Sequence, residues 1–399
     1  MSANDYRLCT RCVMDTTDPN IRFDENGVCN HCTTYHERAG AELFHRDESG
    51  THLEQLLEKI TSAGRRKDYD CIIGVSGGVD STYVALKVKE FGLRPLAIHL
   101  DNGWNSNLAV TNIQNTLKAL DIDLHTIVLD WDEFKTLQLS FLRASTPDSE
   151  VPTDHAIQAV LFKAAKQFGV RYVIGGSNFE TEAIMPIAWS HGMRDWRYIR
   201  SVHCRFSNTP LRTFPHFTLT QFAYDMYIKR LQLVYFLNYI PYVKSEAMET
   251  IQDKLGWVYY GGKHYESIYT RFFQGYILPN KFGFDKRRGH ESTLVCSNQN
   301  TRDQALRNIE SAPYSSPELL REDREFVIKK LGVTERQFGD IMSQPTKTFW
   351  DYPSYERMPL YGVALRGYRF ARNASMRCRS PSSESVTKNG PVQEATKAA

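Results

Sequence analysis

A short glycine-rich string at residues 76–81 constrains this chain more than any other feature. It follows the apolar run 71–75 and precedes a helical pattern over 81–91, which Gly92 closes. Glycines let backbone amides approach an anion without side-chain clashes, and the helix N-terminus adds its positive dipole end. The string therefore predicts a phosphate-binding loop. Its residues are Ser76, Gly77, Gly78, Val79, Asp80 and Ser81.

The polar side chains of this loop fit the same chemistry. Ser76 and Ser81 offer hydroxyl donors, and the Asp80 carboxylate beside a phosphate is best explained by a Mg²⁺ ion between them. The Gly-Lys-Ser/Thr of a Walker loop is absent. A plain glycine turn with a capping serine is the simpler alternative, but the full string at a strand-to-helix junction disfavours it.

An alternation of strands and helices surrounds the loop, and this predicts a parallel sheet covered on both faces. From about Ser201 the alternation gives way to aromatic-rich helical patterns. The apolar region 217–243 contains charged residues, so we expect a buried or amphipathic helix there and no membrane span. The expected strands are 71–75, 95–100, 125–129 and 171–174, and the expected helices are 81–91, 107–120 and 156–168.

Two segments at expected strand ends are candidate nucleotide contacts, because ligands of such sheets bind at the carboxyl ends of the strands. The first is His99, Leu100 and Asp101, where the backbone near Leu100 would contact adenine. The second, 175–178, would lie near the ribose or phosphates through Gly175, Gly176 and Asn178. Each segment is equally compatible with an ordinary strand-end turn.

Four of the eight cysteines lie within the first 32 residues, as two Cys-x-x-Cys pairs. Four thiolates at this spacing complete a tetrahedral Zn²⁺ site, which suits a structural role. An iron–sulfur cluster is the main alternative. The ligands are Cys9, Cys12, Cys29 and Cys32. The scattered cysteines are expected to be small buried hydrophobes; they are Cys71, Cys204, Cys296 and Cys378.

A basic stretch interleaved with aromatic residues follows at 281–288. It could close over the phosphates of a nucleotide or grip a phosphorylated substrate. RNA binding and a solvated basic turn are the alternatives. Its charged residues are Lys281, Lys286, Arg287 and Arg288.

The overall charge of +3 is low for 399 residues, which argues against a nucleic-acid partner. The polar start, 1–11, lacks the apolar core of a signal peptide, so a cytoplasmic location is expected. We expect a cysteine unit at 1–45, a nucleotide-binding domain at 46–200, a helical substrate or partner domain at 201–372, and a disordered tail at 373–399.

The loop resembles the signature of PP-loop ATP pyrophosphatases, and the order of motifs resembles one family more narrowly. The chain carries CTRCVMDTTDP, CNHC, GVSGGVDS, HLDNGW, PTDH and YGGKH between Cys9 and about Leu306. These motifs resemble those of the N-acetyl sugar amidotransferases of bacterial surface-polysaccharide and flagellin-glycan pathways.

This resemblance implies a reaction. The oxygen of an acetamido group attacks the α-phosphate of ATP, pyrophosphate leaves, and ammonia then displaces AMP to give an acetamidino sugar. Asp154 and His155, before a helix on the ligand side, are candidates to take the ammonia proton, although a helix-capping role for Asp154 is as good an explanation. Lys286 and Arg287 join Asp80 and Ser81 as catalytic candidates.

The source of ammonia follows from what the chain lacks. It has no Gly-x-Cys-x-Gly turn, and Ser2 excludes an N-terminal cysteine nucleophile, so a glutaminase of its own is not expected. The family resemblance implies a separate glutaminase subunit and a cyclase-like partner, similar to the histidine-pathway pair. Tyr235, Phe236 and Tyr239 could dock a partner, although core packing is the commoner use of such residues.

Two rival functions stay open at this point. A PP-loop tRNA-modifying enzyme is one, but no cysteine is suited to carry a persulfide, since Cys71 lies within a strand. The other is a non-catalytic zinc-ribbon scaffold, which would have no use for Asp80.

Overall fold

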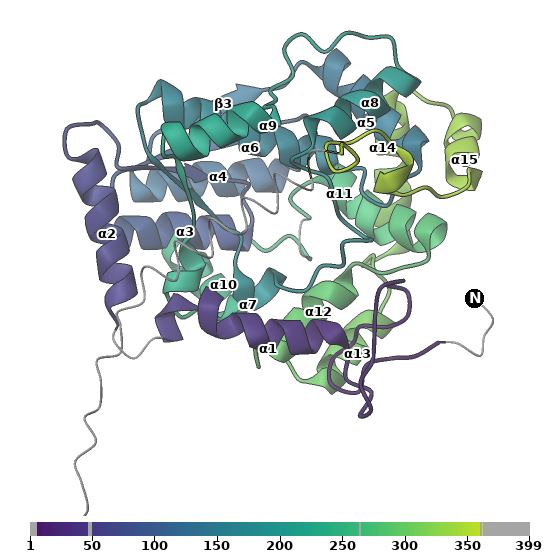
Figure 1. Cartoon of the computed structure of the whole chain (residues 1–399), viewed down its shortest axis with the longest axis horizontal. Coiled ribbons are helices and arrows are strands. Elements are labelled where there is room, and N and C mark those ends of the chain that lie inside the picture. The colour runs from purple at the N-terminus through teal and green to yellow at the C-terminus, as the bar shows by residue number, and fades with distance from the viewer. Residues whose placement is uncertain (1–5, 47–49, 263–264, 360, 362–399) are drawn as a thin grey trace, which may run out of the picture. The chain divides into compact units, whose positions relative to one another are not determined.

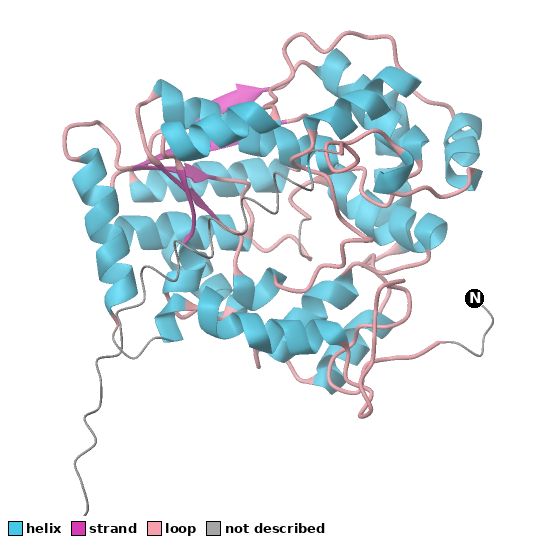
Figure 2. Cartoon of the chain, in the orientation of Figure 1, coloured by secondary structure: helices cyan, strands magenta, loops and turns pink. Residues whose placement is uncertain are grey.

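A parallel five-stranded sheet organises the protein (Figures 1 and 2). The computed structural model describes residues 6–46, 50–262, 265–359 and 361. The strand order is β3-β2-β1-β4-β5, and every neighbouring pair is parallel. The strands are β1 (Cys71–Gly74), β2 (Pro95–Asp101), β3 (Leu124–Val128), β4 (Tyr172–Gly175) and β5 (Gln232–Tyr235).

Helices make up most of the remaining structure. Those up to β5 are α1 (Asn30–Glu42), α2 (Thr51–Gly64), α3 (Val79–Glu90), α4 (Asn107–Leu120), α5 (Trp131–Ala144), α6 (Val151–Gln167), α7 (Phe179–Glu182), α8 (Trp196–Phe206) and α9 (Leu219–Ala223). Those after β5 are α10 (Lys244–Leu255), α11 (Ile268–Phe272), α12 (Arg287–Cys296), α13 (Arg302–Glu310), α14 (Pro317–Leu331) and α15 (Glu335–Ser343). Short 3₁₀ turns η1 (Phe44–Arg46), η3 (Phe236–Tyr239) and η5 (Phe349–Asp351), and π-helical stretches η2 (Tyr224–Ile228) and η4 (Phe273–Phe282), complete the list.

The two faces of the sheet are covered by different helices, as the alternation of side chains in a strand requires. Within β1, Cys71 and Ile73 face a core built with α2, α3, α4 and α10, whereas Ile72 faces a core built with α6. The predicted fold class, a parallel sheet with helices on both faces, is confirmed. The phosphate loop lies where β1 ends and α3 begins.

The region after residue 200 differs from expectation in one respect. The apolar stretch 217–243 is not one helix: it contains α9, η2 and η3, and β5 pairs with β4 as the fifth strand. The apolar run leading into β5 looked helical, because a short strand at a sheet edge is recognised only from its pairing partner. The sequence also gave no expectation for α5.

Residues 1–353 form one compact unit, and a second begins at Ser354. The borders expected near residues 45 and 200 lie inside the first unit. The expected tail from residue 373, which includes Cys378, lies outside the described residues, as do Ser2 and the Lys263-His264 end of the YGGKH motif. Among the helices that the structure describes, none is both long and apolar enough to cross a bilayer.

Candidate active site

The phosphate loop is held in a narrow space that requires its glycines. Gly77 has φ +80°, and a Cβ added there would lie 2.6 Å from the carbonyl oxygen of Ala109 on α4. From the other side, a Cβ on Gly176, just beyond β4, would lie 2.9 Å from the backbone nitrogen of Ser81. The loop after β4 therefore contacts the start of α3 directly, so the predicted segments 76–81 and 175–178 are brought together.

The hydroxyl groups of the loop form a small network of their own. The Ser76 Oγ accepts a hydrogen bond from the amide of Gly78 at 3.2 Å, and lies 3.2 Å from the Ser81 Oγ. The Ser81 hydroxyl also donates to the carbonyl oxygen of Gly78, at 3.2 Å. Both hydroxyls thus line the loop where sequence analysis placed them.

The N-terminus of α3 is ready to receive an anion. Its N-cap is Gly78, so no side chain caps the first turn, and the first amide groups of a helix have no partner within the helix. The indole nitrogen of Trp257 donates to the Gly77 carbonyl oxygen at 2.9 Å, which fixes the loop from the far side. The geometry is that of an anion-binding helix start.

Acidic and phenolic side chains that the sequence did not single out surround the loop. The Tyr242 hydroxyl donates to the Asp80 carboxylate. A Cβ on Gly78 would lie 3.2 Å from the Tyr260 hydroxyl oxygen and 3.5 Å from a carboxylate oxygen of Glu266. Burial, with Glu266 and Asp80 nearby, raises the pKa of Tyr260, so this phenol stays protonated. Tyr260 opens the YGGKH motif, but no local motif marks Tyr242 or Glu266, and all three come from segments far along the chain from the loop.

At the end of β2, the predicted residues are committed to internal contacts. The His99 ring bonds the Val75 carbonyl oxygen at 2.9 Å through Nδ1, and its Nε2 lies 3.1 Å from the Asn105 side-chain nitrogen. A carboxylate oxygen of Asp101 accepts from the Gly103 amide at 2.8 Å. Leu100 is aligned with Ile127 of β3. The His99 and Asp101 side chains therefore shape the strand end through these contacts.

After β4, Asn178 acts as a helix cap. Its side-chain oxygen accepts from the Thr181 amide at 2.9 Å, at the start of α7, and its side-chain nitrogen donates to the Gly176 carbonyl oxygen at 3.3 Å. Asn178 therefore shapes the loop that touches α3.

Asp154, in the first turn of α6, has the most unusual carboxyl group of the site. Burial, followed by the charges of Asp148 and Glu150, raises its pKa to about 8. Lys286 opposes this shift and Glu182 adds to it. Glu182 also raises the pKa of Tyr242, the partner of Asp80, so its charge acts on both the acidic group and the surroundings of the phosphate loop. A carboxyl group that titrates near neutral pH is suited to proton transfer.

His155 does not share this role, which corrects the expectation. Its Nδ1 bonds the Met193 carbonyl oxygen at 2.8 Å, and its Nε2 accepts from the Phe217 amide at 3.3 Å. The ring stacks between Trp196 and Phe217. Burial lowers its pKa to about 4, so it is a neutral core residue. Consecutive residues on a helix point about 100° apart, which is why Asp154 and His155 face different surroundings.

The basic side chains of the stretch 281–288 do not form one surface, because they contact different parts of the protein. The ammonium group of Lys281 donates to the carbonyl oxygen of Ile341 in α15. Arg288 is paired with Asp15 of the N-terminal unit at 3.0 Å. Lys286 differs from the other three: within the described residues its side chain forms no hydrogen bond or ion pair, and its charge acts on Asp154.

Arg287, expected to be catalytic, is a structural anchor instead. It pairs with Asp285 at 2.6 Å and donates to the carbonyl oxygens of Asn308, Ile309 and Ser311. Its donors are therefore already used. The sequence could not reveal the three carbonyl contacts, because they come from α13 and the residue after it.

The four N-terminal cysteines meet as a possible metal centre. All four are fully buried, and their sulfur atoms lie within 4.8 Å of one another. Sulfur–sulfur distances are 3.9 Å for Cys9–Cys32, 3.6 Å for Cys12–Cys29 and 3.7 Å for Cys29–Cys32. Tetrahedral Zn²⁺ with bonds of ~2.3 Å requires separations of ~3.8 Å, so the thiols fit a zinc ion.

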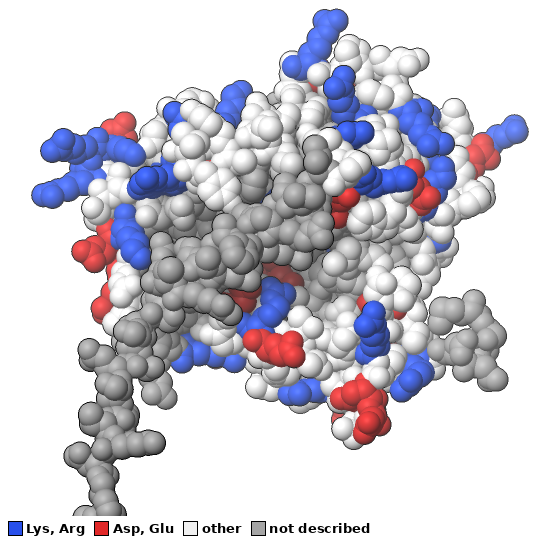
Figure 3. Space-filling model, viewed as in Figure 1, with Lys and Arg blue, Asp and Glu red and all other residues white. Residues whose placement is uncertain are grey.

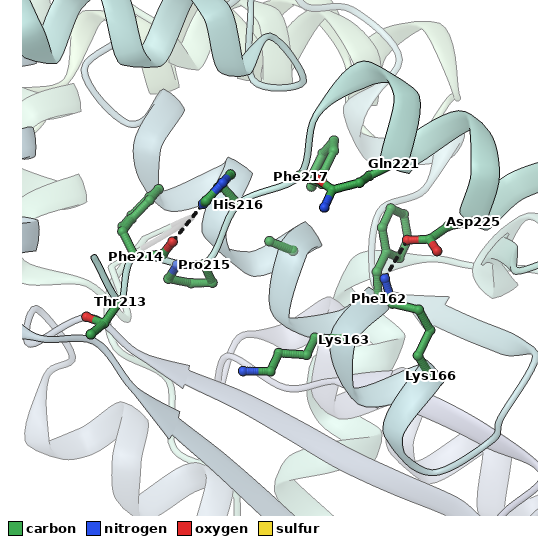
Figure 4. A pocket seen from close by; sticks show the side chains of 11 residues that line it. Phe162, Lys163, Lys166, Thr213, Phe214, Pro215, His216, Phe217, Gln221 and Asp225 are labelled. Atoms are coloured by element: carbon green, nitrogen blue, oxygen red, sulfur yellow. Dashed lines mark hydrogen bonds and ion pairs between the residues drawn. The ribbon is translucent and has the colours of Figure 1, made fainter. Parts of the chain in front are cut away.

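A cavity of about 320 Å³ lies elsewhere, along the outer side of α6 (Figure 4). Its walls include Phe162 and Phe217, and an ion pair of 2.7 Å between Lys166 and Asp225 crosses one end. It borders the middle and C-terminal turns of α6, whereas Asp154 is in the first turn. On the face drawn in Figure 3, Lys and Arg side chains are scattered and form no continuous stripe.

Comparisons with known proteins agree with the family resemblance in the C-terminal part. Residues 266–366 match the family described as LPS biosynthesis protein WbpG-like, C-terminal domain. The resemblance to a family of surface-polysaccharide pathways is thereby confirmed. No curated protein matches the chain.

Three solved structures show a distant likeness. An NMN synthetase from Francisella tularensis is 22% identical with a TM-score of 0.27; the match covers 34% of this chain and 57% of that one. A predicted subunit of a tRNA methyltransferase from Methanocaldococcus jannaschii is 15% identical with a TM-score of 0.28, covering 45% and 73%. An NH₃-dependent NAD synthetase from Campylobacter jejuni is 13% identical with a TM-score of 0.29, covering 74% and 96%. Likenesses this weak carry no argument about function.

Proposed function

We propose that this chain, whose residues 266–366 carry the C-terminal domain of WbpG-like LPS biosynthesis proteins, is an ATP-dependent amidotransferase of the PP-loop type. Its substrate would be an N-acetyl sugar, whose acetamido group becomes an acetamidino group. The observation that carries the proposal is the uncapped start of α3, which follows Gly77 and Gly78 and has Asp80 in its first turn.

The first step activates a weak nucleophile. The acetamido oxygen attacks the α-phosphate of ATP, the bond to the β-phosphate breaks, and an O-adenylyl imidate forms as pyrophosphate leaves. The amides at the start of α3 and the Ser76 and Ser81 hydroxyls would hold the departing pyrophosphate. Lys286 would supply a positive charge on the side of Asp154.

A magnesium ion fits the residues around the loop. Asp80 and Glu266 put carboxylates beside a site for anions, which is unfavourable unless a cation lies between them. These two residues would hold Mg²⁺, and the ion would neutralise charge on the phosphates. Tyr242, which donates to Asp80, would keep that carboxylate oriented.

The second step forms the carbon–nitrogen bond. Ammonia attacks the imidate carbon and AMP leaves with the former acetamido oxygen. Asp154 would take one proton from the attacking nitrogen. Ionised Asp154 is needed for this, so the rate should rise as pH increases toward about 8. Ammonia would come from a separate glutaminase subunit with a cyclase-like partner.

Of the three aromatic residues predicted to dock a partner, only Tyr235 at the end of β5 has an exposed side chain. Phe236 is fully buried and Tyr239 packs on the core, whereas Tyr235 is exposed. The rival tRNA-thiolating function needs an accessible cysteine near the loop. Cys71 is buried in β1, and burial raises its pKa. Cys204 is exposed on α8, outside the segments predicted to contact the nucleotide.

The test is purified protein with Mg²⁺, ATP, ammonium chloride and a panel of nucleotide-linked N-acetyl sugars. The expected result is AMP formation matched by a sugar that has exchanged oxygen for NH, as measured by mass spectrometry. Asp80→Ala should abolish both, whereas Asp253→Ala, on the exposed surface of α10, should not. AMP formed with tRNA but with no sugar would refute the proposal.

A further inference from the structure

The helix α12 joins the four-cysteine unit to the candidate active site. It begins at Arg287, immediately after Lys286, and ends at Cys296 (Figure 1). On one side, Arg288 pairs with Asp15 at 3.0 Å and donates to the Val13 carbonyl oxygen at 2.9 Å. These contacts fix the first turn of α12 to the loop that follows Cys12.

Further along α12, two more contacts reach the same unit. The Ser292 hydroxyl accepts from the Val13 amide at 3.2 Å. The sulfur of Cys296 lies 3.7 Å from that of Cys32, so the end of the helix abuts the metal-binding thiols. From α13, Arg302 donates to the carbonyl oxygens of Cys9 and Cys12 at 2.9 and 3.1 Å. The cysteine unit is thus bound along the whole of α12.

The neighbouring face of α12 contacts the segment after β4. The Thr293 hydroxyl accepts from the Ile184 amide at 3.0 Å. A Cβ on Gly289 would lie 2.7 Å from the Ile184 carbonyl oxygen. The helix and this segment are therefore too close for any side chain at position 289. Glu182, which acts on Asp154, is two residues from Ile184.

The helix α1, which begins at Asn30 between two of the cysteines, contacts the same segment from its own side. Tyr35 of α1 packs against Phe179 of α7 with ring centroids 4.8 Å apart, and Arg46 of η1, just beyond the cysteine unit, pairs with Glu180 at 3.0 Å. The N-terminal unit therefore touches both α7 and α12, the two elements beside Glu182 and Lys286.

The contact through Arg288 is withdrawn from water. Asp15 is fully buried and the Arg288 side chain is 17% exposed. Removing one partner of such a pair leaves the other charge buried and unpaired. Loss of Arg288 should therefore destabilise the packing of α12 against the cysteine unit. The two neighbours of Lys286, Asp285 and Arg287, pair with each other, and the next residue, Arg288, pairs with Asp15. These two ion pairs fix the backbone on which Lys286 lies.

We propose that the metal-bound cysteine unit is a positioning element for the active site, and that Arg288 is the positioning residue through which it fixes Lys286 and α12 against α7. The kinetic consequence rests on the proposed function, in which Lys286 and Asp154 serve the reaction. The structural consequence does not.

The structural test is hydrogen exchange of backbone amides in full-length protein. Arg288→Met should speed exchange at 182–185 and in the first turns of α12, with zinc content unchanged. Asp15→Asn, which removes the charge and keeps the shape, should do the same. Arg288→Lys should restore part of the protection. Arg307→Met, the same change at an exposed position on α13, is the matched control and should leave exchange unaltered.

The kinetic test uses the pH profile of AMP formation. The groups that act on Asp154 are Asp148, Glu150, Glu182 and Lys286, of which only Lys286 lowers its pKa. If Arg288 acts through Lys286, both Arg288→Met and Lys286→Met should move the rising limb to higher pH. The double variant should move it no further than Lys286→Met alone. A misplacement of ~1 Å at an active site can cost ~100-fold in rate, so kcat should also fall.

The outcomes separate the two ideas. Faster exchange in Arg288→Met without any ATP turnover in the wild type would support positioning and remove the proposed function. Unchanged exchange in both Arg288→Met and Asp15→Asn, or a pH limb that stays in place in a protein that forms AMP, would overturn the positioning role.

Discussion

Replacing Asp154 by Asn should make the protein less active and more stable at the same time. The folded protein raises the pKa of this carboxyl group from 3.8 to about 8. Between these values the folded state binds the proton more tightly than the unfolded state does. Stability contributed by the protonated group is therefore complete at low pH and is lost as pH rises toward about 8.

The size of the effect follows from this interval. Each pH unit of a one-proton difference corresponds to ~1.4 kcal/mol, so the whole interval gives at most ~6 kcal/mol. Asp154 is partly exposed, and water screening reduces the value, so we expect roughly half. Asparagine does not titrate. Asp154→Asn should thus gain stability over the wild type progressively as pH increases.

The assay is urea denaturation of wild type and variant at several values between about pH 5 and pH 8. The difference in unfolding free energy should grow with pH, and kcat for AMP formation should fall ~100-fold or more. Asp253→Asn, an exposed carboxylate on α10, is the control and should show a constant difference. A constant difference for Asp154→Asn as well would refute the raised pKa and the proton-transfer role built on it.

Three further predictions concern the loop and its surroundings. His155→Phe should lower the unfolding free energy by ~1–3 kcal/mol but leave kcat nearly unchanged, because both ring nitrogens bond the backbone. The stability difference between wild type and His155→Phe should shrink as pH falls from about 6.5 toward 4, because the unfolded wild type takes up a proton at His155 in this range and the folded protein does not; urea denaturation of both proteins would show it. Tyr242→Phe should raise the KM for ATP about tenfold, since a hydrogen bond to the charged Asp80 is worth ~1.5–3 kcal/mol. Gly77→Ala should abolish ATP binding in calorimetry, whereas Gly92→Ala should cost stability alone, because φ is positive at both sites but only at Gly77 would the new methyl group meet a backbone carbonyl.

The phosphate loop could be predicted because its signals are local. An apolar strand, two glycines and a helix start stand next to one another in the sequence, and each reports on its own backbone. The cysteine cluster is similar, since two Cys-x-x-Cys pairs bring their own ligands together. The fifth thiol, Cys296, lies 264 residues from Cys32 and could only be placed by the fold.

The basic stretch 281–288 shows where sequence reasoning fails. Four charges within eight residues look like one surface, yet the side chains of Lys281, Arg287 and Arg288 each bond a different part of the protein. The direction in which a side chain leaves the backbone decides which residue it bonds, and the amino-acid composition of the stretch does not reveal that direction. The same is true of Tyr242, Tyr260 and Glu266, whose place beside the loop depends on long-range packing.

An isotope measurement tests the central claim most directly. The protein would be given ATP, Mg²⁺, ammonium chloride and a nucleotide-linked N-acetyl sugar whose acetamido oxygen is ¹⁸O. If that oxygen attacks the α-phosphate and ammonia displaces AMP, the label must leave the sugar and appear in the phosphate of AMP. AMP that carries no ¹⁸O, formed while the sugar keeps its label, would contradict the account.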